Sequence, residues 1–236
     1  MLKELLYDYK VPSDKKVTDF DVKVSNIQVV RDFVESWHYS KSVNGLRISH
    51  VFGLYCEDNL IGAMIYGPLG MANAWRKYGE SESDVIELRR LCCIDDTPKC
   101  TESYFIVKTQ RWLKKNTDHK IIVSYADAYH GHTGVIYRAT NFKHEGLTSP
   151  GRLIKYGDKT YHDKAIRTKY KNKLKPFPQK LRDALESGDA HYVNTPGKHI
   201  YTFRLRCYNI NSFFRIRLCL AETMKKLILS YMVCIM

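Results

Sequence analysis

The stretch that decides the predicted fold is Ile121–Phe142, IIVSYADAYHGHTGVIYRATNF. It opens with apolar, β-branched residues, a pattern typical of a buried strand. A polar loop follows, and apolar residues then return at helical spacing at Val135, Ile136 and Ala139. A strand, a loop and a short helix make half of an α/β unit. The rest of the chain is therefore expected to extend this unit into a sheet covered by helices.

Polar side chains gather where this strand ends. In open α/β sheets, binding and catalytic groups collect at the carboxyl ends of strands. A turn with a purely structural role does not need so many polar groups, so this turn is the first candidate for a functional site. The side chains are Ser124, Tyr125, Asp127, Tyr129, His130 and His132.

Periodicity on either side of this stretch predicts the other elements. Ser25 is in position to cap a helix, and the loop 68–84 is long enough to be functional. The order of elements indicates an α/β (α+β) protein with a central mixed, twisted sheet flanked by helices. We expect helices at 26–37, about 104–113 and 180–187, a hairpin of 50–56 and 60–67, and strands at 85–94, 121–123, 143–148, 152–156 and 199–204.

Composition bounds the class of protein. The 236 residues are 44% hydrophobic and carry a net charge of +13, which favours a polyanionic partner such as nucleic acid. The seven cysteines form no CxxC pair, which indicates reduced thiols rather than a disulfide or zinc framework. The sequence shows neither a signal-peptide core nor an apolar run of about 20 residues, so we expect a cytoplasmic protein with no membrane partner.

One segment of the chain is strongly basic. We divide the chain into an N-terminal arm (1–24), a folded domain (25–206) that contains the basic segment 161–180, and a C-terminal tail (207–236). Lysine and arginine neutralise phosphates, and aromatic rings stack on bases. Lys169, Lys171 and Lys173, interleaved with aromatic residues, are therefore expected to contact double-stranded DNA. A solvated basic surface without a partner is the alternative.

The order helix, hairpin, strand, helix, strand, helix, strand resembles the GNAT acyltransferase fold. Members commonly end the last core helix with Tyr, three residues and Gly-Phe. Here Tyr137 is followed by Asn141-Phe142, and asparagine, like glycine, tolerates a left-handed backbone. The resemblance implies that Tyr137 protonates a leaving group and that acetyl-CoA is the acyl donor. The loop 95–103 departs from the family, because it has no glycine and three acidic residues that would repel a pyrophosphate.

A second, more specific resemblance covers residues 37–146. It is carried by His38-Tyr39-Ser40, by Glu87-Leu88-Arg89-Arg90-Leu91, by Thr97-Pro98 with Glu102-Ser103, and by Ser124-Tyr125-Ala126-Asp127 with Gly131-His132-Thr133-Gly134 and Ile136-Tyr137. These stretches resemble the phage Mom family. The resemblance implies an acyltransferase-like enzyme that adds a carbamoylmethyl or acyl-type group to N6 of adenine in DNA. Such a group protects phage DNA from host restriction endonucleases.

Carried over by position, this resemblance implies a catalytic set. Attack by the weakly nucleophilic adenine N6 needs a base, for which His38 and Asp127 are candidates, while Tyr39 or Tyr137 would protonate the leaving group. Arg89 would hold an anionic group of the donor. The set is His38, Tyr39, Arg89, Asp127 and Tyr137, with Ser124 and Tyr129 expected to meet the substrate. His130 and His132, with His38 and Asp127, are candidate ligands of a metal such as iron.

Two other functions stay open from the sequence. An ordinary GNAT N-acetyltransferase acting on a small amine or a protein lysine agrees with the order of elements and with Tyr137. A non-catalytic DNA-binding protein on the same scaffold agrees with the basic segment. Modified nucleosides in cellular DNA would distinguish an enzyme that modifies adenine N6 from both alternatives.

Overall fold

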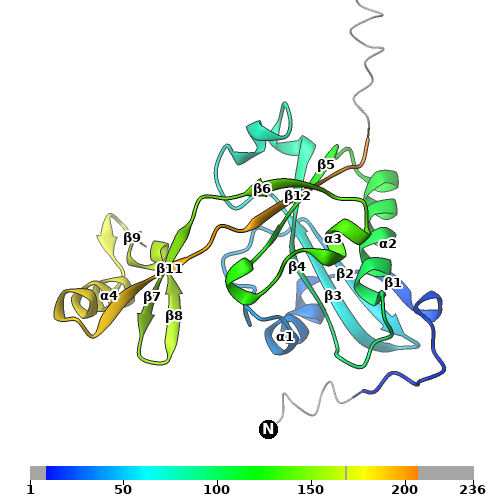
Figure 1. Cartoon of the computed structure of the whole chain (residues 1–236), viewed down its shortest axis with the longest axis horizontal. Helices are drawn as coiled ribbons and strands as arrows, with labels where there is room; N and C mark the ends of the chain where they lie inside the picture. The colour runs from blue at the N-terminus through cyan, green and yellow to red at the C-terminus, as the bar shows by residue number, and fades with distance from the viewer. Residues whose placement is uncertain (1–8, 168, 207–236) are drawn as a thin grey trace, which may run out of the picture. The chain divides into compact units, whose positions relative to one another are not determined.

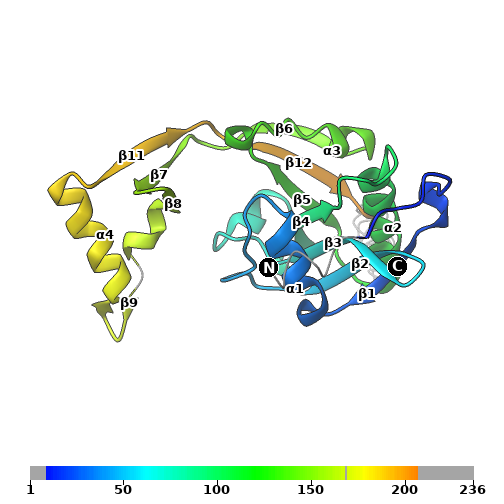
Figure 2. The same ribbon diagram turned by 90° about the horizontal axis from the view of Figure 1, so that it is seen from below.

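A seven-stranded sheet organises the chain in the computed structural model, which describes residues 9–167 and 169–206. Neighbouring strands are antiparallel except for one parallel pair, β4 and β5. The order across the sheet is β1 (Asp21–Ser25), β2 (His50–Cys56), β3 (Asn59–Gly67), β4 (Val85–Cys93), β5 (Ile121–Ala126), β12 (His199–Arg204) and β6 (Lys143–Leu147). Figures 1 and 2 show β1 and β2 at one end of this sheet and β6 at the other. The predicted mixed α/β architecture is confirmed.

Three helices pack on this sheet: α1 (Ile27–Trp37), α2 (Thr101–Asn116) and α3 (Val135–Ala139). The cap of α1 differs from the prediction by one residue. Asn26, not Ser25, caps it, and its side-chain oxygen accepts the N–H of Val29 at 3.1 Å. Ser25 is instead the last residue of β1, paired opposite Val51. The sheet therefore begins inside the segment that was expected to be an arm.

The two parallel strands separate after a short pairing. β4 and β5 are paired only from Val85–Leu88 against Ile121–Ser124. Beyond Leu88, β4 pairs with β3 alone, while β5 continues beside β12. The register between β3 and β4 shifts there, because Tyr66 lies opposite Leu88 and Ile65 opposite Arg90, which leaves Arg89 as a bulge. This opening lies next to the polar turn after β5.

A small lobe is inserted between β6 and β12. Its sheet runs in the order β11-β7-β8, and Ile154, Leu181, Ala184 and Ala190 form its separate core. The lobe contains β7 (Gly151–Tyr156), β8 (Lys159–His162), β9 (Lys169–Tyr170), β10 (Lys173–Leu174), α4 (Pro176–Ser187) and β11 (Ala190–Thr195). The sequence predicted β7 and the second half of α4 but not the other strands, which are short and largely exposed. The tail 207–236 lies outside the described residues.

Among residues 9–167 and 169–206, none of the helices combines the length and the apolar character needed to span a bilayer.

Candidate active site

Three imidazoles surround the ring of Tyr39 beside the opening between β4 and β5. The ring centroids of His38, His130 and His132 lie 4.3, 4.5 and 5.1 Å from that of Tyr39. Tyr39 follows α1, whereas the other two histidines belong to the turn after β5. The tyrosine is 44% exposed, and burial of its remaining surface raises its pKa, so the phenol keeps its proton at neutral pH. The structure thus brings two distant predicted motifs together.

His38 is buried and neutral. Desolvation, reinforced by Arg90 and the two other histidines, lowers the pKa of His38 to about 3. Its Nδ1 accepts the backbone N–H of Ser40 at 3.1 Å and lies 2.8 Å from the Ser40 hydroxyl. These contacts assign the ring proton to Nε2. Since the nitrogen with the lone pair is already bonded, His38 is placed as a hydrogen-bond donor rather than as the expected base.

Asp127 organises the turn that carries the histidines. One carboxylate oxygen accepts the N–H of Tyr129 at 3.1 Å, and the other lies 2.6 Å from the ammonium of Lys198. The carbonyl of Asp127 also accepts the N–H groups of His130 and His132. Lys198 escaped the sequence reasoning, because nothing near it in the sequence indicates that it pairs with Asp127.

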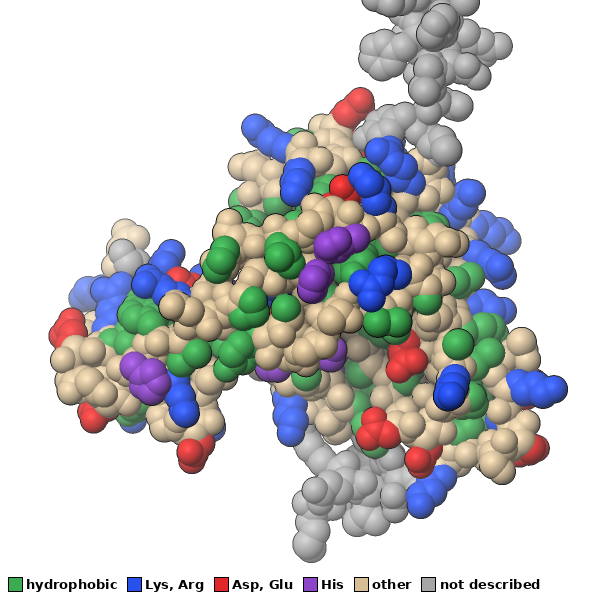
Figure 3. Space-filling view, in the orientation of Figure 1, with side chains coloured by type: hydrophobic (Ala, Val, Ile, Leu, Met, Phe, Trp, Pro, Cys, Tyr) green, Lys and Arg blue, Asp and Glu red, His purple; other side chains and the backbone are tan. Residues whose placement is uncertain are grey.

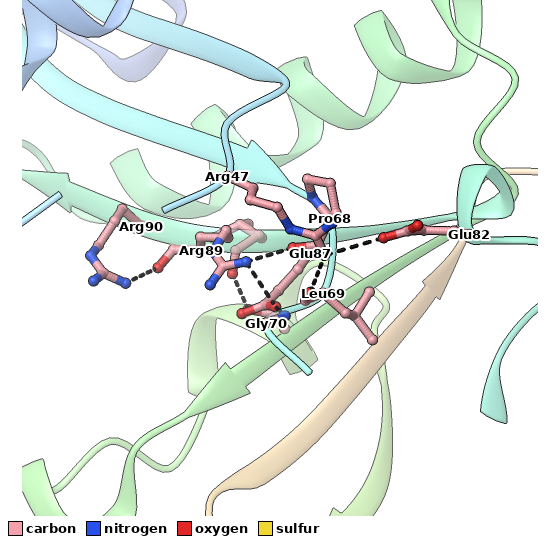
Figure 4. A network of polar contacts seen from close by, with 10 residues as sticks. Arg47, Pro68, Leu69, Gly70, Glu82, Glu87, Arg89 and Arg90 are labelled. Atoms are coloured by element: carbon pink, nitrogen blue, oxygen red, sulfur yellow. Dashed lines mark hydrogen bonds and ion pairs between the residues drawn. The ribbon is translucent and has the colours of Figure 1, made fainter. Parts of the chain in front are cut away.

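Arg89 belongs to a network that fixes the start of the β3–β4 segment (Figure 4). Its Nη1 donates to the carbonyl of Pro68 at 2.5 Å and lies 3.6 Å from the Glu87 carboxylate. Glu87 also accepts the N–H of Gly70 at 3.0 Å, and Arg47 donates to the carbonyl of Leu69. The Glu87 carboxylate therefore lies where Arg89 was expected to hold an anionic group of the acyl donor.

Arg90, which is absent from the predicted catalytic set, has other partners than Arg89 has. Its guanidinium donates to the carbonyls of Arg89 at 2.7 Å and Ser42 at 3.2 Å. Its charge also contributes to the low pKa of His38 and opposes the rise in the pKa of Tyr39. The motif contains both arginines, and the contacts in the fold distinguish the one that acts on His38 and Tyr39 from the one held by Pro68.

Tyr137 and Ser124 form a buried pair under the site. Tyr137 is 7% exposed, and its ring packs 5.2 Å from that of Tyr201. Burial raises the pKa of Tyr137 to about 12, although Ser124 partly opposes the rise, so Tyr137 holds a proton that it can donate. Ser124 is fully buried, and its hydroxyl donates to the carbonyl of Leu88. It therefore supports Tyr137 and is not exposed to a substrate.

The remaining predicted residues divide between the site and the lobe. Tyr129 is 41% exposed, and its ring centroid lies 5.2 Å from that of His130. Lys171 is exposed in the turn between β9 and β10, with a positive φ of 47°, and Lys173 is exposed as the first residue of β10. Lys169 is in β9, paired opposite Leu174. The structure thus places these lysines in the lobe, outside the main sheet.

In the usual mode of CoA binding, the pyrophosphate would lie against the loop between β4 and α2. Asp95 and Asp96 are exposed there, and Pro98 has no N–H. The N–H of Thr101 is already bonded to the Pro98 carbonyl at 3.3 Å. A pyrophosphate cradle needs free N–H groups and no nearby carboxylates, so these residues do not fit the usual mode of CoA binding.

The second question is whether side chains in the described part of the chain could bind a metal ion. No group of three or more His, Cys, Asp or Glu side chains is arranged there to hold an ion. His130 and His132, the candidate ligands, both pack against the Tyr39 ring.

A parallel strand pair that opens beside a bulge, within this strand order, defines the GNAT acyltransferase-like fold. A sequence model of the Mom protein family matches residues 19–209. The chain belongs to the Mom protein family. None of the curated proteins matches it significantly.

Solved structures that match are acetyltransferases with low sequence identity. A Bacillus subtilis acetyltransferase in complex with CoA is 10% identical, covers 79% of this chain and 99% of its own, and gives a TM-score of 0.46. A spermidine/spermine N-acetyltransferase from Vibrio cholerae, in complex with manganese ions, is 8% identical over 80% of this chain and 94% of its own, with a TM-score of 0.45. A ribosomal L7/L12 alpha-N-protein acetyltransferase is 8% identical over 81% and 96%, with a TM-score of 0.44.

Proposed function

We propose that this protein is a phage-type enzyme that modifies the N6 amino group of adenine in DNA and so protects the DNA from host restriction endonucleases. The observation that carries the proposal is the coincidence of the family match with the cluster around Tyr39. The family model spans residues 19–209, and the rings of His38, His130 and His132, from two separate motifs, pack against Tyr39. An acetyltransferase of small amines is the weaker candidate, because the β4–α2 loop does not offer the usual pyrophosphate cradle.

The reaction needs two proton transfers. A bond forms between adenine N6 and the carbon of an activated acyl or alkyl donor, and the bond from that carbon to its leaving group breaks. The N6 proton passes to Asp127, whose carboxylate Lys198 orients at 2.6 Å. Tyr137, kept protonated by burial, donates its proton to the leaving group. In this proposal the Nε2–H of neutral His38 donates a hydrogen bond to an acceptor atom of the substrate.

The exposed aromatic rings suit an extruded base. Adenine N6 takes part in base pairing, so an enzyme acting on it flips the nucleotide out at a cost of a few kcal/mol. Tyr39 and Tyr129 are 44% and 41% exposed, and both rings pack against that of His130. Stacking on such rings contributes about 1–3 kcal/mol per base, which offsets part of the cost of flipping.

Charge supports a DNA partner. The chain carries a net charge of +13, and Lys171 and Lys173 are exposed in the lobe. Phosphate contacts of this kind supply affinity without reading sequence, whereas the groups around Tyr39 supply the chemistry. The lobe and the opening of the sheet therefore have separate roles in this proposal.

A nucleoside digest tests the proposal. DNA from cells expressing the protein is hydrolysed to nucleosides and analysed by mass spectrometry beside DNA from cells expressing the Asp127→Asn variant. We expect a mass-shifted deoxyadenosine with the parent and only ordinary deoxyadenosine with the variant, and the mass identifies the transferred group. If the folded parent protein is abundant and all deoxyadenosine is unmodified, the proposal is refuted.

A further inference from the structure

A basic groove crosses the sheet at the end far from β1. It lies between η3 (Ala74–Lys77) in the β3–β4 segment and the strands β6 and β12, and encloses about 530 Å³. Figure 3 shows Lys and Arg side chains gathered at the upper end of the face it draws, over the β3–β4 segment and the ends of β6 and β12. The lining residues are Lys77, Tyr78, Ile121, Asn141, Lys143, Glu145, Thr202, Phe203 and Arg204.

The charges of the groove favour an anion. Its lining holds three cations and one carboxylate, which leaves a net charge of +2. The carboxylate of Glu145 is already bound by Lys143 at 3.0 Å and by the Thr202 hydroxyl at 2.9 Å. Lys77 lies over the ring of Tyr78, and within the described residues it has no ion-pair partner. An incoming phosphate would therefore meet a cation that makes no ion pair with residues 9–167 or 169–206.

Apolar and aromatic side chains also line the groove. They are Tyr78, Ile121 and Phe203, and Ile121 begins β5, the strand whose other end carries the polar turn of the candidate active site. Tyr78 packs on the same buried cluster as Tyr125, which is also on β5. The groove and the candidate active site are therefore connected along β5.

We propose that this groove binds the DNA backbone, with Lys77 contacting a phosphodiester of the strand that carries the target adenine. The inference rests on the proposed function, since it takes DNA to be the substrate. It adds a phosphate contact on the main sheet to the lysines of the lobe. The apolar side chains of the groove pack against a deoxyribose, while the cations neutralise the phosphate charge.

Variants of the groove test the assignment through the salt dependence of DNA binding. Affinity for a duplex of about 30 base pairs is measured between 50 and 200 mM salt for the parent, Lys77→Gln, Glu145→Gln and Lys23→Gln. Lys23 is the matched control, because it also lies over a tyrosine ring, Tyr55, but on β1 at the opposite edge of the sheet. Thermal unfolding of each variant confirms that it is folded.

Lys77→Gln is expected to weaken DNA binding, and Glu145→Gln is expected to strengthen it. Each phosphate contact contributes about 0.9 to the slope of log affinity against log salt, so Lys77→Gln loses about that much, equivalent to about 3.5-fold over this fourfold range of salt. Glu145→Gln removes the one carboxylate and strengthens binding, and Lys23→Gln matches the parent. If the parent modifies DNA and the salt slopes of Lys77→Gln, Lys23→Gln and the parent are equal, the assignment of the groove is wrong but the proposed function stands. A parent without affinity for DNA overturns both the groove and the proposed function.

A free nucleotide carries the same phosphate chemistry, and a second probe separates the two sources. Binding of deoxyadenosine monophosphate is measured for the parent and Lys77→Gln. We expect the substitution to weaken binding of the duplex and to leave binding of the mononucleotide unchanged. If it weakens the mononucleotide and not the duplex, the groove is a nucleotide site and the assignment to the DNA backbone is wrong.

Discussion

Replacing Gly134 by alanine tests how the helix that carries Tyr137 is positioned. Gly134 has a φ of +74° and directly precedes α3. A Cβ atom at this position would lie 2.2 Å from Cε2 of the Tyr201 ring. That ring is fully buried, and its hydroxyl donates to the Thr133 carbonyl at 2.6 Å and accepts from Arg138 at 3.1 Å. The ring therefore cannot move away without losing these bonds.

The expected cost has two parts. A left-handed backbone costs a residue other than glycine roughly 1–2 kcal/mol. Forcing an extra methyl group into a packed core costs about 1–3 kcal/mol more. Gly134→Ala should therefore lower the free energy of unfolding by about 2–5 kcal/mol, which for a domain of this size corresponds to a fall in Tm of roughly 4–20 °C.

Gly131→Ala is the control, because Gly131 has almost the same φ, +76°, yet an added Cβ meets nothing within 4 Å. Gly131→Ala should lower the free energy of unfolding only by the cost of the left-handed backbone, about 1–2 kcal/mol. Urea denaturation of both variants isolates the contact with Tyr201 as the difference. Since Tyr201 packs 5.2 Å from Tyr137, Gly134→Ala should also reduce DNA modification. Equal stabilities of the two variants would refute the reasoning.

Three further predictions concern the site and the lobe. Asp127→Asn and Tyr137→Phe should keep DNA affinity and abolish modification; a variant that modifies DNA at the parent rate removes that residue from the mechanism. Replacing Lys171 and Lys173 by glutamine should flatten the salt slope of DNA binding by about 1 per lost contact, and an unchanged slope would show a solvated surface. Burial lowers the pKa of His38 from 6.5 to about 3, so between these values the unfolded chain binds a proton that the folded chain does not. The free energy of unfolding that this shift contributes is therefore fully present above pH 6.5 and is lost as the pH falls toward 3. Measured by urea unfolding, His38→Asn should lose less stability than the parent between pH 6.5 and about 5.

Local patterns in the sequence determined most of the main sheet. Hydrophobic periodicity depends on neighbouring residues alone, so α1, the β2–β3 hairpin, β4 and β5 all lie close to their predicted bounds. The small strands of the lobe escaped prediction because β9 and β10 have two residues each, too few to show a period. The cap of α1 moved from Ser25 to Asn26 because pairing with β2 holds Ser25 in the sheet.

Tertiary structure alone decided how the candidate site is assembled. The sequence named His38, Tyr39 and the two histidines of the turn, but only folding packs their rings together. The bulge at Arg89 depends on the register between β4 and β3, and folding lets Arg89 donate to the Pro68 carbonyl while Arg90 helps to lower the pKa of His38. Lys198 meets Asp127 because β12 pairs with β5. Such contacts depend on residues far apart in the chain, and local periodicity carries no information about them.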